Sequence, residues 1–133
     1  MSQQYMHIAV AGLHLSGQPL NHQLTGLGGT LIRTCQTASR YKMFLIEDAR
    51  GKKPGLAQLS HNAIGNAYEI EVWSLPIEQV GTFLSFIPAP LGLGTVVLED
   101  DTTVTGFICE HRVAEEGKDI SEFAGWKDYL KRL

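Results

Sequence analysis

Short apolar runs broken by turn-forming residues constrain this chain most, because they restrict it to a fold built mainly from strands. Residues 5–12 (YMHIAVAG) are β-branched and apolar enough to predict a buried strand. Residues 30–38 (TLIRTCQTA) and 41–48 (YKMFLIED) have the same character. Residues 49–55 (ARGKKPG) combine glycine and proline, which predicts a turn after the third strand.

Two further segments predict pairs of strands. Residues 95–110 (TVVLEDDTTVTGFICE) alternate around the pair Asp100–Asp101, which indicates a hairpin, and Gly106 indicates a bulge or a close approach. Residues 56–76 (LAQLSHNAIGNAYEIEVWSLP) predict a second hairpin with its turn near Gly65.

Three segments carry helical signals. Residues 19–28 begin with proline, which suits a first helical turn, and residues 76–87 have apolar side chains at helical spacing. Residues 119–133 predict an amphipathic helix capped by Asp119 or Ser121.

Strand signals outnumber helical ones, so we predict an α+β fold. Its sheet is expected to be a small mixed or antiparallel β-barrel of about six or seven strands, with about two or three helices outside it. The 133 residues contain no linker or repeat, which predicts a single domain over residues 1–133.

Charge and composition argue against several partners. A net charge of −3 with scattered Lys and Arg predicts neither nucleic-acid nor membrane-surface binding. No apolar run reaches the roughly 20 residues that span a bilayer, and the N-terminus lacks a signal-peptide pattern, so we expect a cytoplasmic protein. Cys35 and Cys109 lie in strand-like runs, which favours buried thiols over a disulfide.

Most motifs for chemistry are absent from the sequence. It has no nucleotide-binding glycine loop, no HExxH and no CxxC. Its five histidines, His61 among them, do not occur at HxH or HxxxH spacing. We therefore expect neither a metal nor another cofactor.

Residues 11–24 (AGLHLSGQPLNHQL) make the strongest case for a site. A glycine-bounded loop between a strand end and a helix N-terminus presents free backbone N–H groups, and the helix dipole favours a carboxylate there. His14 lies in this loop, where an imidazole can donate a hydrogen bond or a proton near neutral pH. On the residues alone, a structural role in orienting the loop is the favoured alternative for His14.

Other polar and aromatic side chains also have two interpretations. Asn21 adjoins the predicted helix start, where it is expected to brace the loop. Glu69 and Glu71 alternate onto one strand face and line either a barrel mouth or a solvated surface. Tyr41 and Trp73 are typical of a core or of a site rim.

Several longer segments of the sequence, in order from about residue 7 to residue 130, carry a resemblance to a known family. They are GLHLSGQPLNHQL, YKMFLI, KPGL, EIEVWSLP, FIPAPLGLGTVVLEDDTTVTGFICE and DISEFAGWKDYL. Together they resemble the C-terminal domain of allophanate hydrolase. The resemblance implies a γ-glutamyl cyclotransferase-like fold and, in urea-type nitrogen metabolism, decarboxylation of the N-carboxycarbamate that a separate amidase domain produces.

The resemblance places the family's functional histidine, in a G-x-H-L loop, on His14 and so favours a catalytic role for it. His14 would then donate a proton to the substrate nitrogen while the backbone of residues 12–15 holds a carboxylate. The substrate-binding residues expected around it are Gly12, Leu13, Leu15, Ser16, Gly17, Asn21, Tyr41 and Glu71.

The sequence also departs from related enzymes. Cyclotransferase relatives use a tyrosine-glycine-serine loop and a glutamate acid/base, whereas this chain has AGLHLSG and FIPAPLG, so cyclotransferase activity is not expected. The expected partners are a small carboxylate substrate and either a separately encoded amidase or a second copy of the chain. The alternative function is a non-catalytic module that binds a small acid or docks on that amidase.

Overall fold

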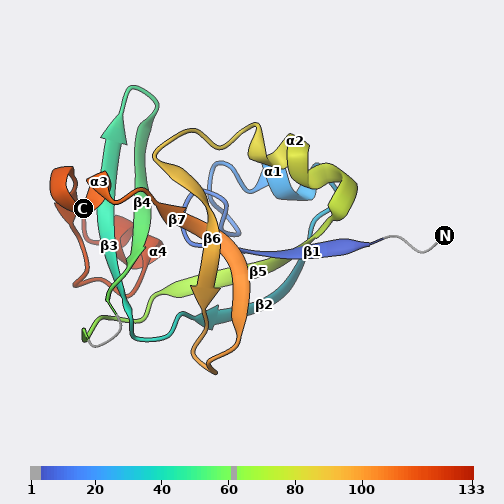
Figure 1. Cartoon of the computed structure of the whole chain (residues 1–133). Coiled ribbons are helices and arrows are strands. Elements are labelled where there is room, and N and C mark those ends of the chain that lie inside the picture. The colour runs from blue at the N-terminus through green and yellow to red at the C-terminus, as the bar shows by residue number, and fades with distance from the viewer. Residues whose placement is uncertain (1–3, 61–62) are drawn as a thin grey trace.

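Strands dominate the architecture, which a computed structural model describes for residues 4–60 and 63–133 (Figure 1). His61, one of the candidate ligands considered above, lies outside the described residues. Within them, the strands are β1 (Tyr5–Val10), β2 (Thr30–Gln36), β3 (Tyr41–Asp48), β4 (Gly51–Gln58), β5 (Glu69–Pro76), β6 (Leu91–Val97), β7 (Thr103–Cys109) and β8 (Lys118–Asp119). The predicted α+β class is confirmed, with a short strand, β8, that sequence reasoning missed.

The strands form two open sheets rather than one closed barrel. The first has the order β2-β5-β1-β7-β6 and is mixed, because β1 pairs antiparallel with β5 and parallel with β7. The second has the order β4-β3-β8. Figure 1 shows β3 and β4 running crosswise to β1 and β5.

Small residues let the strands and the two sheets approach closely. A Cβ atom on Gly55 of β4 would lie 2.9 Å from the Cβ of Cys109 on β7. The Cys109 thiol donates to the Leu56 carbonyl at 3.3 Å, and burial raises its pKa to about 11. On Gly106, a Cβ would lie 2.8 Å from the Cβ of Ala9, which confirms the predicted close approach.

The turn predicted over residues 49–55 is confined to residues 49 and 50, so its extent was wrong, because β4 already begins at Gly51. β4 lies at the edge of its sheet, where a proline such as Pro54 is tolerated since that position need not donate to the ladder. The predicted hairpin over residues 56–76 was also wrong. β4 pairs with β3, whereas β5 pairs with β1 and β2 in the other sheet. The β6–β7 hairpin around Asp100–Asp101 is confirmed.

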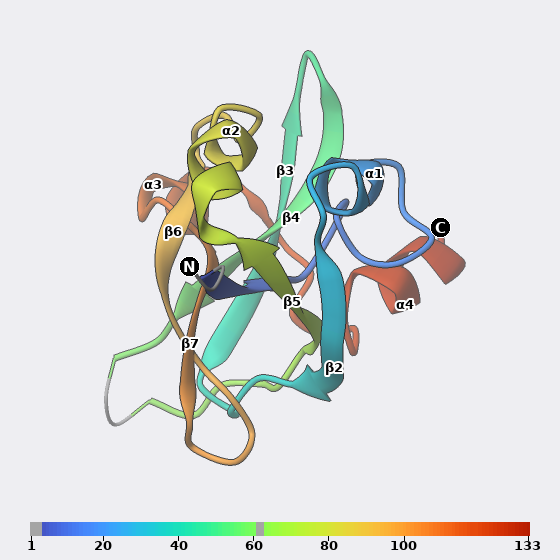
Figure 2. The same cartoon turned by 90° about the vertical axis from the view of Figure 1, so that its right-hand side faces the viewer.

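The helices are short and lie outside the sheets. Those in the described residues are α1 (His22–Thr25), α2 (Val80–Leu84, after a 3₁₀ turn over Ile77–Gln79), α3 (Arg112–Glu116) and α4 (Trp126–Lys131). Both cartoons place α1, α2 and the tip of the β3–β4 hairpin on one side of the molecule (Figures 1 and 2). No helix in residues 4–60 and 63–133 has the length and apolar character needed to cross a membrane.

Two helix starts differ from the prediction. The helix expected from residue 19 begins at His22, because the preceding loop closes its own turns, with the Leu20 N–H donating to the Leu13 carbonyl at 2.8 Å. The tail helix begins at Trp126 instead of near residue 121. There Ser121 is held against β3, since its hydroxyl oxygen accepts the Met43 N–H at 3.1 Å.

Candidate functional site

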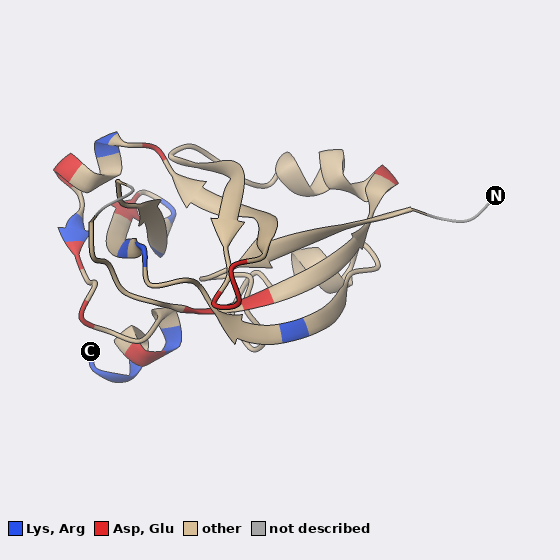
Figure 3. Cartoon of the chain, turned by 60° about the horizontal axis from the view of Figure 1, so that its bottom comes forward, with Lys and Arg blue, Asp and Glu red and all other residues tan. Residues whose placement is uncertain are grey.

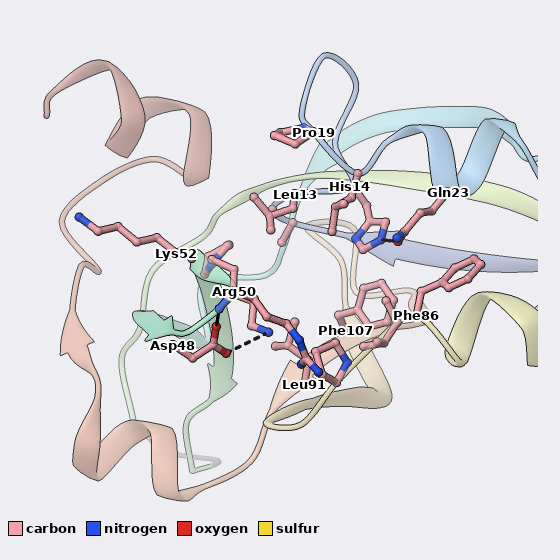
Figure 4. Close-up of a pocket in the computed structure, with 18 of the residues that line it drawn as sticks. Leu13, His14, Pro19, Gln23, Asp48, Arg50, Lys52, Phe86, Leu91 and Phe107 are labelled. Atoms are coloured by element: carbon pink, nitrogen blue, oxygen red, sulfur yellow. Dashed lines mark hydrogen bonds and ion pairs between the residues drawn. The ribbon is translucent and has the colours of Figure 1, made fainter.

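A cavity of about 710 Å³ opens between segments that are distant in the sequence. Its walls come from the β1–α1 loop, the tip of the β3–β4 hairpin, the segment after α2, and Phe107 of β7 (Figure 4). The packing of both sheets against one another therefore creates the site, because no single element supplies more than one wall.

His14 is buried at this cavity, with 7% of its surface exposed. Its ring lies edge-on to Phe83, with 5.2 Å between ring centroids, and 5.7 Å from the centroid of Phe107. Its Nε2 lies 2.7 Å from Oε1 of Gln23 in α1. Burial lowers the pKa of His14, and this outweighs the opposing effect of the Gln23 hydrogen bond. The imidazole is therefore mainly neutral near pH 7.

A buried carboxylate anchors the loop that carries His14. Oε1 of Glu71 on β5 accepts the backbone N–H of Ser16 at 2.8 Å and the Ser16 hydroxyl at 3.0 Å. The same oxygen accepts the indole N–H of Trp73 at 3.0 Å. Glu71 is only 6% exposed, so these bonds replace its hydration and fix the loop to the five-stranded sheet.

Further contacts hold the loop from its other side. Asn21 donates from its side-chain amide to the His14 carbonyl at 2.8 Å, which is the bracing role predicted for it. Gly17 has a φ of +80°, a conformation that favours glycine. At Gly12, a Cβ would lie 2.5 Å from the ring of Pro54, so this glycine lets the loop pack directly on β4.

The β3–β4 hairpin supplies the charges of the cavity. Arg50, Lys52 and Lys53 line it together with Asp48. Lys53 is buried and forms an ion pair with Asp48 at 3.7 Å, while the other Asp48 oxygen accepts the Arg50 N–H at 2.8 Å. That backbone hydrogen bond, more than the cations beside it, lowers the pKa of Asp48. Figure 3 shows that β1, α1 and α2, which flank the opposite walls, carry no Lys, Arg, Asp or Glu.

Only some of the predicted site residues reach the cavity. Gly12, Leu13 and His14 line the cavity, whereas Leu15 is buried under the loop and Gly17 is exposed away from it. Ser16, Asn21 and Glu71 hold the loop rather than face the cavity, through the hydrogen bonds given above. Tyr41 is fully buried in the core, where its hydroxyl accepts the Val97 N–H at 2.9 Å.

The predicted anion cradle is reduced by the loop's own hydrogen bonds. The Leu15 N–H donates to the Gly12 carbonyl at 3.0 Å and so is not available to a ligand. Because α1 spans only four residues, its dipole adds little. For Gly12, Leu13 and His14, the N–H groups have no protein acceptor within residues 4–60 and 63–133.

Sequence reasoning missed the basic hairpin and the phenyl rings around His14. Residues 49–55 have the composition of a turn, and no role in a site was predicted for them; the cations Arg50, Lys52 and Lys53 were the available signal. No three His, Cys, Asp or Glu side chains of the described part of the chain are grouped to hold a metal ion.

Comparison with known proteins identifies the family of the chain. Residues 6–131 match the family model of the allophanate hydrolase C-terminal domain. The chain belongs to this family. It is 36% identical over 129 residues to urea amidolyase of Saccharomyces cerevisiae and, to the same extent, to that of Lachancea kluyveri. This allophanate hydrolase C-terminal domain covers 95% of its own length but only 7% of theirs.

Solved structures show how the fold recurs. The domain superimposes on Kluyveromyces lactis allophanate hydrolase with a TM-score of 0.90 and 34% identity, covering 97% of this chain and 21% of the other. A uropathogenic E. coli-specific protein matches at a TM-score of 0.87 and 28% identity over 98% of both chains. A γ-glutamyl cyclotransferase, at a TM-score of 0.62 and 8% identity, shares the fold over 87% of this chain and 70% of its own. The predicted fold family is thus confirmed.

Proposed function

We propose that the domain binds a small carboxylated urea or carbamate in the cavity and removes carbon dioxide from it, with N-carboxycarbamate as the leading substrate. The observation that carries the proposal is the position of His14, which is buried at one wall while the cationic hairpin forms another. Membership of the allophanate hydrolase C-terminal domain family supports the choice of substrate. The reaction belongs to urea-type nitrogen metabolism in the cytoplasm.

The proposed reaction is a proton transfer followed by bond cleavage. His14, as imidazolium, gives its proton to the central nitrogen of N-carboxycarbamate. The C–N bond to one carboxylate then breaks, its electron pair goes to the nitrogen, and carbon dioxide and carbamate leave. The neutral imidazole regains its proton from solvent.

The lowered pKa of His14 suits this role. An imidazolium in an apolar pocket is a stronger acid than one in water, so it transfers its proton more readily. An anionic substrate beside it opposes the effect of burial and favours the charged form in the complex. We therefore expect kcat/KM to fall as pH rises through a pKa below 6.5, and kcat to fall at a higher pH.

The test is carbon dioxide release by His14→Ala, measured with N-carboxycarbamate generated in situ by an amidase. Turnover should fall by about 100- to 10,000-fold while the circular dichroism spectrum is retained. His111→Ala is the matched control, since His111 is exposed, directly precedes α3 and is not among the residues that line the cavity, and it should keep full activity. Unchanged turnover by folded His14→Ala would exclude the proposal.

A second candidate function is a module that binds a small acid without turnover, or that docks on a separately encoded amidase. The pairing of His14 Nε2 with Gln23 favours it, because a neutral imidazole held in this way acts as a fixed hydrogen-bonding group. Malonate binding without any catalysed release of carbon dioxide would support this module. Co-elution with the amidase in gel filtration would support docking, and separate elution would count against it.

A further inference from the structure

We propose that Arg50 and Lys53 bind a second carboxylate of the ligand, so that the site selects dicarboxylates over monocarboxylates. The inference deepens the proposed function and rests on it, because it names what the end of the ligand remote from His14 must be. It assigns a binding role to a hairpin whose composition alone predicts a turn.

The first observation is the burial of the Lys53 side chain. This side chain is only 10% exposed, although a buried ammonium is unfavourable unless it is fully paired. Its ion pair with Asp48 is 3.7 Å long, which is beyond the length of a good charge-assisted hydrogen bond. The ammonium therefore retains donor capacity at the cavity wall for a second anion.

The second observation is the position of the Arg50 guanidinium. Figure 4 shows its side chain reaching across the cavity toward Leu91, whereas Lys52 points away from the cavity. Within the described residues, the Arg50 guanidinium takes part in no ion pair, since Asp48 contacts Arg50 through the backbone N–H. Guanidinium groups bind carboxylates through two parallel hydrogen bonds, so a free one in a cavity suits this ligand.

The charge balance of the cavity points the same way. Two cations, Arg50 and Lys53, lie at the cavity beside one carboxylate, Asp48, in a chain whose net charge is −3. The walls around His14 are apolar and include Phe107, which also forms part of the cavity lining. A dicarboxylate can place one carboxylate at the hairpin cations and the other at His14, so that it contacts both ends of the cavity. A monocarboxylate leaves one end of the cavity without an anionic partner.

The experiment measures binding of malonate and of monoethyl malonate, which is larger but has one charge, by isothermal titration calorimetry. Wild type should bind malonate at least about 10-fold more tightly. Arg50→Gln and Lys53→Met should each weaken malonate binding by about 10-fold and reduce that preference. Lys52→Met is the matched control on the same hairpin and should change the affinity less than about twofold.

The outcomes separate this inference from the proposed function. Unchanged malonate affinity in Arg50→Gln, which replaces an exposed side chain, overturns the inference even if His14→Ala abolishes carbon dioxide release. Malonate binding that depends on Arg50 supports the inference even if His14→Ala leaves turnover intact. Lys53→Met is interpreted only together with its circular dichroism spectrum, because Lys53 is buried.

Discussion

Replacing Glu71 by alanine should both destabilise the domain and loosen the loop that carries His14. The substitution removes one oxygen that accepts three hydrogen bonds, from the Ser16 N–H, the Ser16 hydroxyl and the Trp73 indole. Hydrogen bonds to a charged group contribute about 1.5 kcal/mol each at the low end, so the gross loss is about 4–5 kcal/mol. Part of it is offset, because the desolvation cost of the buried carboxylate disappears as well.

We therefore expect Glu71→Ala to lower the free energy of unfolding by about 3 kcal/mol, which leaves a domain of ordinary stability folded. With a urea m-value of about 1.5 kcal/mol/M, the midpoint of urea unfolding should fall by about 2 M. Far-UV circular dichroism is the appropriate probe, because the substitution alters the surroundings of Trp73 and hence its fluorescence.

Glu69→Ala is the matched control, since Glu69 lies two residues earlier on β5 and is exposed. It should change the free energy of unfolding by no more than about 0.5 kcal/mol. Glu71→Gln keeps an acceptor and should lose less than Glu71→Ala. The reasoning is refuted if Glu71→Ala costs no more than Glu69→Ala, or if its cost is the same in a Ser16→Ala background, because bonded partners must be coupled.

Two further predictions concern the same loop. Gly12→Ala should lower the free energy of unfolding by about 1–3 kcal/mol and weaken malonate binding, because the new Cβ would lie 2.5 Å from Pro54. Urea unfolding measures the stability and calorimetry measures the malonate affinity. Wild-type values of both would contradict the prediction. Since the folded-state pKa of His14 lies below its ordinary 6.5, its stabilising contribution is complete above pH 6.5 and is lost as pH falls toward the folded value. Urea midpoints of wild type and His14→Gln at pH 7.5 and 5 should show a smaller acid-induced loss in the variant, and parallel losses would exclude this linkage.

Local sequence determined the elements whose residues interact with near neighbours. The strand expected over residues 41–48 is β3 with the same bounds, and the hairpin around Asp100–Asp101 is β6–β7. The turn residues of this hairpin and the alternation of apolar and polar residues in its strands specify it without contributions from the rest of the chain. The bracing role of Asn21 is also local, because its partner, His14, lies seven residues away.

Tertiary structure alone decided which strands are neighbours and which side chains meet. In the sequence, Pro54 predicts a turn, because proline is tolerated within a strand only when that strand lies at the edge of a sheet. Whether β4 is an edge strand depends on the strand order of the whole sheet. Likewise, Glu71 contacts Ser16 across 55 positions of sequence, a pairing that alternation along β5 does not specify.

The site follows the same division. The glycine-bounded loop marked His14 as a candidate from the sequence, and the family resemblance strengthened it. The cavity around His14 exists only because β1, the β3–β4 hairpin, the segment after α2 and β7 converge on one side of the fold. Burial, and with it the lowered pKa of His14, depends on that convergence, since desolvation comes from atoms that are remote in sequence.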